Sequence, residues 1–121
     1  MKMTFRPHHK LLAWTEAMAL VRVVYEATCS FPKQETYGLA AQLRHAAVSV
    51  PSNLAEGAAR NSRKEFHYFL GIARGSLSEL ETQLLIALDL GYLSDEHQAF
   101  AALERVSRLV SGLHRKLATA A

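Results

Sequence analysis

The 121-residue sequence predicts an all-α fold, an antiparallel up-down-up-down four-helix bundle. Apolar residues recur at steps of three and four along four long segments, which is the period of one face of a helix. No segment shows the sustained alternation of apolar and polar residues that is typical of a half-buried strand. The connections between the segments are short, so consecutive helices should lie antiparallel.

The first helix is expected over roughly residues 9–29. The apolar stripe that we expect to face the core comprises Leu11, Trp14, Met18, Val21, Tyr25 and Thr28. Pro32 ends this helix because it cannot donate a backbone hydrogen bond. Residues 1–8 should form a flexible N-terminal segment of a single domain that comprises residues 1–121.

The second helix is expected over roughly residues 37–60, with Thr36 as its N-cap. Its apolar stripe comprises Leu39, Leu43, Ala46, Val50 and Leu54. Pro51 lies in the middle of this segment and removes one hydrogen bond to the carbonyl of Ala47. We therefore expect a kink or a short break near Pro51.

The third helix is expected over roughly residues 63–90. Ser62 and Glu65 predict a capping box at its start, and Gly91 is the expected glycine after its end. Its apolar stripe alternates steps of four and three without a miss, and comprises Phe66, Leu70, Ala73, Leu77, Leu80, Leu84 and Ala87.

Beside this stripe the third helix carries small residues at helical spacing, namely Gly71, Gly75 and Ser78. A glycine inside a helix costs ~1 kcal/mol relative to alanine, so two of them one turn apart indicate close approach of another helix. Two interpretations are open. These residues face helices of the same bundle, or part of this surface meets another subunit.

The fourth helix is expected over roughly residues 95–117, with Ser94 as its N-cap. Asp95 and Glu96 would suit the positive end of the helix dipole. Its apolar stripe comprises Phe100, Leu103, Val106, Val110, Leu113 and Leu117.

The formal net charge is +3, from 14 basic and 11 acidic side chains, and it is unevenly distributed. Residues 65–96 carry six acidic side chains and one basic, whereas residues 36–64 and 97–121 each carry four basic and one acidic. The candidate contacts to phosphates of RNA or DNA are Arg60, Arg63, Lys64, Arg105, Arg108, Arg115 and Lys116. The alternative is a solvated outer face, because no aromatic platform or recognition motif accompanies these residues.

The sequence shows no pattern of catalytic chemistry. No glutamate precedes a histidine by three residues, as in the di-metal centres of bundles, and Glu79 and Glu81 point to different faces of their helix. The single cysteine excludes an intrachain disulfide, and no segment approaches the ~20 apolar residues of a membrane span. We expect a cytoplasmic non-enzyme with no cofactor, no bound metal and no membrane partner.

Several motifs together resemble the four-helix-bundle family of 23S ribosomal RNA intervening sequence proteins. The motifs are FPK at residues 31–33, YGL at 37–39, QLRHAAVSVPSNLAEG at 42–57, KEF at 64–66, GSLSELETQL at 75–84 and GYL at 91–93. Trp14 also stands where the family's first helix has its tryptophan, and the resemblance covers about residues 10–117. The family commonly has two basic residues where this chain has Arg44 and His45, which weakens a charge-based role for the second position.

The resemblance implies a cytosolic bacterial bundle that assembles as a homopentamer and to which no catalytic activity is attached. The family is similar to the accessory variability proteins of diversity-generating retroelements, which are basic pentameric barrels that bind nucleic acid and a reverse transcriptase. The polar motif residues that the resemblance makes structural or interfacial are Arg44, Asn53, Glu56, Glu65, Glu79 and Glu81.

Two hypotheses about function follow. The first is a non-enzymatic homo-oligomer that binds RNA or DNA through phosphate contacts of a basic surface. The second is a protein-interaction scaffold without nucleic-acid binding, whose partner is another protein such as a polymerase-like enzyme. The residues themselves fix neither the stoichiometry nor the helix faces that join the subunits.

Overall fold

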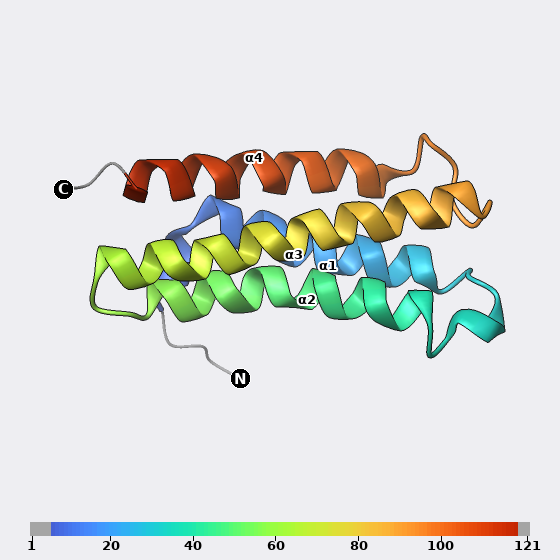
Figure 1. The fold of residues 1–121 in the computed structure, drawn as a ribbon, viewed down its shortest axis with the longest axis horizontal. Coiled ribbons are helices and arrows are strands. Elements are labelled where there is room, and N and C mark those ends of the chain that lie inside the picture. The colour runs from blue at the N-terminus through green and yellow to red at the C-terminus, as the bar shows by residue number, and fades with distance from the viewer. Residues whose placement is uncertain (1–5, 119–121) are drawn as a thin grey trace.

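A computed structural model describes residues 6–118 of the chain. These residues fold into four α-helices and two short 3₁₀ helices, with no strand among them (Figure 1). In chain order the elements are η1 (Pro7–Lys10), α1 (Leu12–Thr28), η2 (Lys33–Glu35), α2 (Leu39–Ala58), α3 (Arg63–Asp89) and α4 (Gln98–Ala118).

The predicted antiparallel four-helix bundle is confirmed. Successive helices run in opposite directions along the long axis of the molecule (Figure 1). Helices α2 and α4 each pack against both α1 and α3, whereas α1 and α3 do not contact each other. The four helices therefore surround one core, with α1 and α3 on opposite corners of the bundle.

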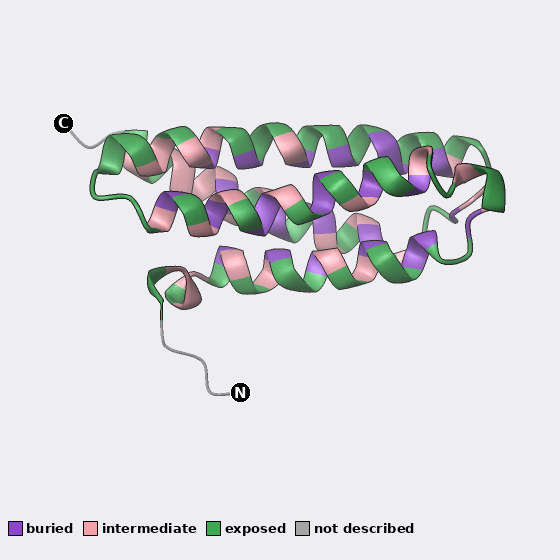
Figure 2. Ribbon diagram, turned by 90° about the horizontal axis from the view of Figure 1, so that it is seen from below, coloured by how far each residue is buried: buried purple, intermediate pink, exposed green. Residues whose placement is uncertain are grey.

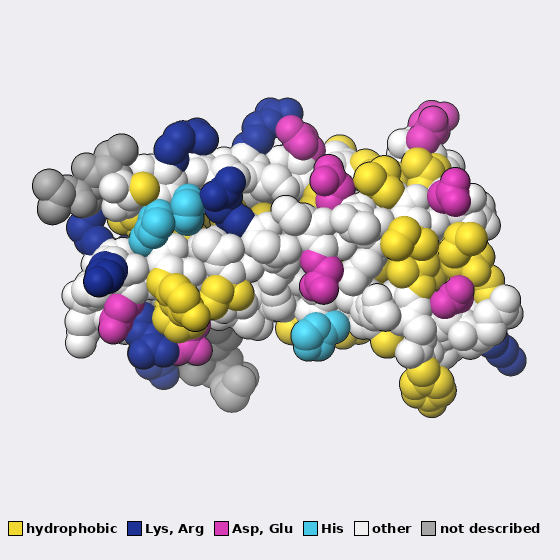
Figure 3. All heavy atoms as spheres, viewed as in Figure 1, with side chains coloured by type: hydrophobic (Ala, Val, Ile, Leu, Met, Phe, Trp, Pro, Cys, Tyr) yellow, Lys and Arg dark blue, Asp and Glu magenta, His cyan; other side chains and the backbone are white. Residues whose placement is uncertain are grey.

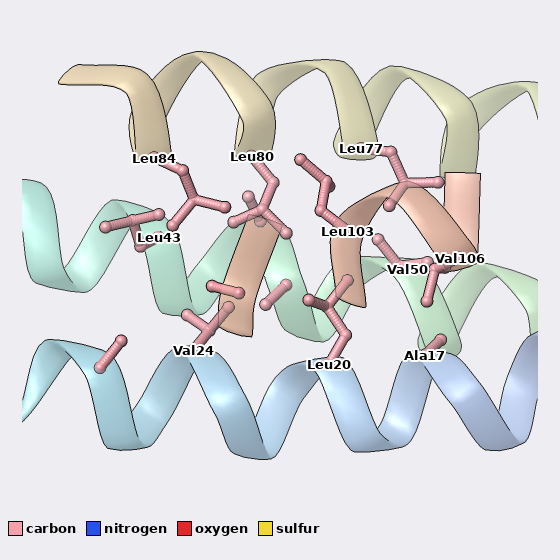
Figure 4. Close-up of a cluster of buried hydrophobic side chains, with 14 of the residues drawn as sticks. Ala17, Leu20, Val24, Leu43, Val50, Leu77, Leu80, Leu84, Leu103 and Val106 are labelled. Atoms are coloured by element: carbon pink, nitrogen blue, oxygen red, sulfur yellow. The ribbon is translucent and has the colours of Figure 1, made fainter. Parts of the chain in front are cut away.

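The core is built mainly from the stripes predicted for α2, α3 and α4 (Figure 4). Leu43, Leu80 and Val106 are among its fully buried side chains, and burial of each such side chain stabilises the fold by about 1.5–3 kcal/mol. Stripe members near the helix ends, such as Phe66 and Leu113, are half-buried. In Figure 2 every helix alternates between buried and exposed residues, as amphipathic helices around one core do.

The stripe predicted for α1 is wrong. Its core face instead comprises Ala13, Ala17, Leu20, Val24 and Ala27. Met18 is 48% exposed and Tyr25 is 42% exposed, and of the predicted stripe only Thr28 is buried. The two stripes have the same spacing, so the period alone does not decide which one faces the core. The larger side chains suggested the wrong face.

Helix α2 continues through Pro51 without the break that the sequence suggested (Figure 1). Proline removes the backbone bond to the carbonyl of Ala47, but side chains supply bonds to the next two carbonyls. Ser52 Oγ donates to Val48 O at 2.8 Å, and Asn53 Nδ2 donates to Ser49 O at 2.8 Å. The helix therefore continues despite the loss of one backbone bond at the proline.

The start of α2 also differs from the prediction. The helix begins at Leu39, and Thr36 does not cap it. The carboxylate of Glu35, at the end of η2, accepts a hydrogen bond from Leu39 N at 3.1 Å. A side chain four residues upstream therefore satisfies one of the free N–H groups of the first turn.

The end of α3 follows the prediction, and at its start the N-cap bond forms without the reciprocal Glu65 side-chain bond that would complete the predicted capping box. Ser62 Oγ accepts a hydrogen bond from Glu65 N at 3.1 Å, as an N-cap does. Gly91 has φ of +80°, the left-handed conformation that glycine adopts after a helix. The bonds Tyr92 N to Ala87 O at 2.9 Å and Gly91 N to Leu88 O at 3.0 Å complete a Schellman motif.

Helix α4 begins at Gln98, three residues later than expected, and Ser94 is not its cap. Ser94 instead starts a turn in which its carbonyl accepts a bond from His97 N at 3.2 Å. His97 Nδ1 then accepts from Ala99 N at 3.0 Å and so caps the first turn. Histidine is not a common N-cap residue, which is why local sequence chemistry pointed to Ser94.

The expected flexible segment over residues 1–8 falls largely outside the described residues, which begin at residue 6. Pro7–Lys10 form η1 rather than the start of α1. The rings of His8 and His9 lie 4.9 and 5.2 Å from the ring of Trp14, and η1 packs against both α1 and α2.

Gly57→Ala should lower the free energy of unfolding by about 1–3 kcal/mol, although alanine is the better helix former. A Cβ at Gly57 would lie 2.9 Å from both Phe66 Cδ1 and Phe69 Cβ, and the latter cannot move without its backbone. The control is Gly75→Ala, because a Cβ there meets nothing within 4 Å. It should stabilise the monomer by ~1 kcal/mol in urea unfolding at low protein concentration. Equal gains from both substitutions would contradict the predicted clash.

Candidate nucleic-acid interface

The two basic segments of the sequence converge at one end of the bundle, where α3 begins and α4 ends. Arg63 Nη2 donates to the carbonyl oxygen of Lys116 at 3.4 Å, across 53 positions of the chain. Figure 3 shows several dark blue side chains on this end, around two neighbouring histidines. This surface, called the basic end below, comprises Arg60, Arg63, Lys64, Arg74, Arg115 and Lys116, all of them exposed.

The charge of Arg60, within the basic end, is partly offset. Its Nη2 lies 2.9 Å from Glu56 Oε2, and its guanidinium lies 4.9 Å above the ring of Phe69. Both side chains of the ion pair are about half exposed, and such a pair contributes about 0–1 kcal/mol. The pair and the ring hold the guanidinium in one position without removing it from solvent.

Arg105 and Arg108 do not belong to this end. Arg105 Nη1 lies 2.9 Å from Glu16 Oε1 on α1, and Arg108 Nε lies 3.2 Å from Glu104 Oε1 one turn earlier. The fourth helix therefore does not present a uniform basic stripe. Its first two candidate arginines face carboxylates, whereas Arg115 and Lys116 join the residues of the α2–α3 turn.

A pair of stacked histidines lies beside the basic end and was not selected from the sequence. The rings of His67 and His114 are 4.0 Å apart, and Arg74 Nη1 lies 3.3 Å from His114 Nδ1. Because arginine only donates, Nδ1 accepts, and neutral His114 carries its proton on Nε2. His67 Nε2 is buried and has no hydrogen-bond partner among the described residues.

One comparison with known proteins identifies a family for this chain. The family model described as 23S rRNA-intervening sequence protein matches residues 9–112. The chain belongs to this family. No curated protein matches the chain. The family match includes Arg60, Arg63, Lys64 and Arg74, whereas Arg115 and Lys116 lie beyond its last matched residue.

Within the range that matches the 23S rRNA-intervening sequence proteins, Arg44 joins the end of α1 to α2. Its Nε donates to Thr28 Oγ1 at 2.7 Å, and its Nη2 lies 3.4 Å from Tyr25 O, a carbonyl of the last turn of α1. The guanidinium also lies 4.6 Å from the centre of the Tyr25 ring. A cation at this position satisfies carbonyls at the negative end of the helix dipole.

The other polar motif residues have different surroundings. Asn53 bonds to its own helix, Glu56 pairs with Arg60, and the backbone of Glu65 takes the N-cap bond. Glu79 and Glu81 are exposed on different sides of α3. Glu79 lines a shallow groove against α2, and Glu81 lines the groove against α4.

The groove between α3 and α4 has a volume of about 450 Å³, and small residues make up more than half of its lining. The small residues of this lining are Gly71, Gly75, Ser78, Ser107 and Ser111. A Cβ on Gly71 would lie 3.8 Å from His114 Nε2, an ordinary contact, and one on Gly75 would meet nothing. Close approach of helices inside this bundle therefore does not explain either glycine.

No group of three or more His, Cys, Asp or Glu side chains in residues 6–118 could hold a metal ion. Over the same residues, every helix falls short of the length and apolar character that crossing a membrane demands.

Acid should destabilise the fold in part through His114. Burial, then the charges of His67 and Arg74, lower the pKa of His114 below its usual 6.5, so the folded state favours the neutral ring. This contribution is complete above about pH 6.5 and is lost as the pH falls below that value. We expect His114→Gln to flatten the pH dependence of the unfolding free energy below about pH 6.5.

The pKa of His8 is also lowered, mainly by burial, so some acid sensitivity should remain in the His114→Gln variant. Urea unfolding of both proteins across the pH range measures the difference. A difference between them that does not change with pH would contradict the assignment to His114.

Proposed function

We propose that this member of the 23S rRNA-intervening sequence protein family is a cytoplasmic, non-enzymatic homo-oligomer that binds RNA or DNA through its basic end. The observation that carries the proposal is the convergence of Arg63 and Lys116 from segments 53 residues apart. Exposed basic groups from two helices at one site can contact successive phosphates of one strand. The contacts would be to the backbone, so binding should tolerate many base sequences.

The oligomer is supported by apolar surface that the bundle leaves uncovered. Tyr68 is 64% exposed, and Met18 and Leu85 are about half exposed, on helices whose other faces form the core. Large uncovered apolar surface usually marks an interface. The number of five subunits rests on the family resemblance alone. Repetition of the basic end in an assembly would multiply its phosphate contacts and so increase affinity.

The non-enzymatic part of the proposal is supported by the way polar motif residues are used. Arg44 joins two helices, and Asn53 bonds a carbonyl beside the helical proline. These contacts stabilise the fold, and they leave neither side chain placed for proton transfer to a substrate.

A titration of fluorescent RNA and DNA of one sequence, single- and double-stranded, at several salt concentrations tests nucleic-acid binding. The logarithm of the association constant should fall linearly with the logarithm of the salt concentration. Absence of binding at low salt, or binding that salt does not affect, would reject it. Light scattering tests the oligomer separately, and a 13.4 kDa particle at micromolar concentration would reject that part.

The second candidate is a protein-interaction scaffold, and the apolar patch at the end opposite the basic end favours it. Leu85, Ile86 and Leu90 are 50%, 44% and 52% exposed there, and Tyr37 is 96% exposed. Figure 3 shows yellow side chains gathered on this end. A pull-down that recovers one defined protein after nuclease treatment, together with a failed salt titration, would favour this candidate over the first.

A further inference from the structure

We propose that the subunits of the homo-oligomer join head to tail, with the outer face of α3 of one copy seated in a groove between α1 and α2 of the next. This proposal rests on the homo-oligomer proposed above. One of the two contact surfaces includes the stripe of α1 that does not face the core.

The receiving surface is an apolar groove of about 350 Å³ between α1 and α2, called the α1–α2 groove below. Its apolar lining comprises Trp14, Met18, Val21, Val48, Pro51 and Ala55. The α1 members repeat at steps of four and three, which is the spacing of a seam that receives another helix. Among the described residues, η1 covers the seam at Trp14 and contacts both α1 and α2, whereas Met18 and Val48 farther along remain 48% and 40% exposed.

The inserting surface is the outer face of α3, which comprises Tyr68, Ile72, Gly75, Glu79, Thr82 and Ile86. Its members also repeat at steps of four and three, and all of them are exposed. Gly75 lies near the middle of this face, where a Cβ would meet nothing in its own chain. A glycine there lets the backbone of α3 approach a second helix closely.

The positions of the two surfaces require a head-to-tail contact. Helices α1 and α3 lie on opposite corners of the bundle and do not touch, so their outer faces point in different directions. Each copy therefore offers one groove and one inserting face. When two different surfaces of identical chains meet, the assembly grows by rotation and closes as a ring if the angle permits.

The charges beside the two surfaces are complementary. Glu79 lies within the inserting face and is exposed. Beside the groove, Arg22 lies one turn after Met18 on α1, and Arg44 lies over Tyr25. Glu16 and Glu56 are each bonded to an arginine, and the exposed Glu26 lies one turn beyond Arg22, farther from Met18. In the proposed contact, Glu79 of a second copy would lie near Arg22 and Arg44 of the groove.

Disulfide cross-linking of single-cysteine variants tests the contact. In a Cys29→Ser background, Met18→Cys and Ile72→Cys place one thiol on each surface, and Ala101→Cys on the exposed side of α4 is the collision control. Mixed Met18→Cys and Ile72→Cys proteins should form dimers under mild oxidation at least several-fold faster than either variant mixed with the control. Dimers from Met18→Cys alone would show that α1 pairs with itself and would overturn the proposal.

Complementation between two surface variants gives a second readout. Met18→Arg blocks the groove, and Ile72→Arg blocks the inserting face. Each variant alone should scatter as a monomer, and their mixture should form a one-to-one dimer through the single intact contact. If both variants keep the mass of the natural protein, other faces form the interface, and the homo-oligomer survives without this contact. A monomeric natural protein would instead reject the homo-oligomer itself.

Discussion

Replacement of Arg63, Lys64, Arg115 and Lys116 by glutamine should weaken binding to double-stranded nucleic acid by at least about tenfold at low salt. These four exposed groups carry most of the charge of the basic end. If each contacts one phosphate, their loss should also reduce the slope of log K against log salt by about three to four. The salt titration used for the natural protein measures both quantities.

A matched pair of double variants separates a local effect from a change in overall charge. Arg115→Gln with Lys116→Gln and Arg105→Gln with Arg108→Gln remove two positive charges each from the same helix. Arg105 and Arg108 already face Glu16 and Glu104, so their loss should affect binding less. Equal losses of affinity would contradict a site at the basic end and would indicate that only net charge matters.

The sequence predicts most of the fold because three helices have one dominant apolar stripe each. In α3 the large residues Leu70, Leu77, Leu80 and Leu84 follow a single line, and every one of them is buried. The two ends of α3 were also predictable, because Ser62 and Gly91 act within one turn of the helix. In α3 the capping residues and the helical period predict the same helix boundaries.

The start of α4 was not predictable in the same way. Ser94 is a good cap by type, but the chain uses it to begin a turn, and His97 takes the capping role. Ser94 and His97 lie within four positions, and either could cap the helix. Which of the two caps the helix depends on the path of the connection between α3 and α4. The local sequence pattern does not specify that path.

Five of the six basic residues of the site were candidates from the sequence, but Arg74 was not, and the separation of Arg105 and Arg108 from the others was not predicted. Arg105, Arg108 and Arg115 share one face of α4 by helical spacing. Contacts between helices divide that stripe, because α1 supplies Glu16 to Arg105, while Arg63 from α3 reaches Lys116. The register of α4 against its neighbours therefore decides which charges act together.

Helix α1 shows a different difficulty, since two stripes of equal period compete on it. One contains Trp14, Met18 and Val21, and the other contains Ala17, Leu20 and Val24. Size favours the first stripe, yet the second is buried, with all three members at 0% exposure. In an oligomer both stripes would be covered, the second by the core of its own subunit and the first by another subunit.

This choice can be tested with two substitutions of similar helix propensity, Leu20→Ala and Met18→Ala. Leu20→Ala should lower the free energy of unfolding by about 2–5 kcal/mol, because it leaves a cavity in the core. Met18 is about half exposed within one chain, so its replacement should cost far less when the protein is dilute. Urea unfolding at two protein concentrations measures both effects.

The concentration dependence distinguishes the two roles. The loss from Leu20→Ala should be the same at both concentrations, because it arises inside one chain. The loss from Met18→Ala should grow at the higher concentration, because the natural protein then gains stability by association that the variant lacks. Equal losses from the two substitutions in dilute solution would mean that Met18 belongs to the core after all.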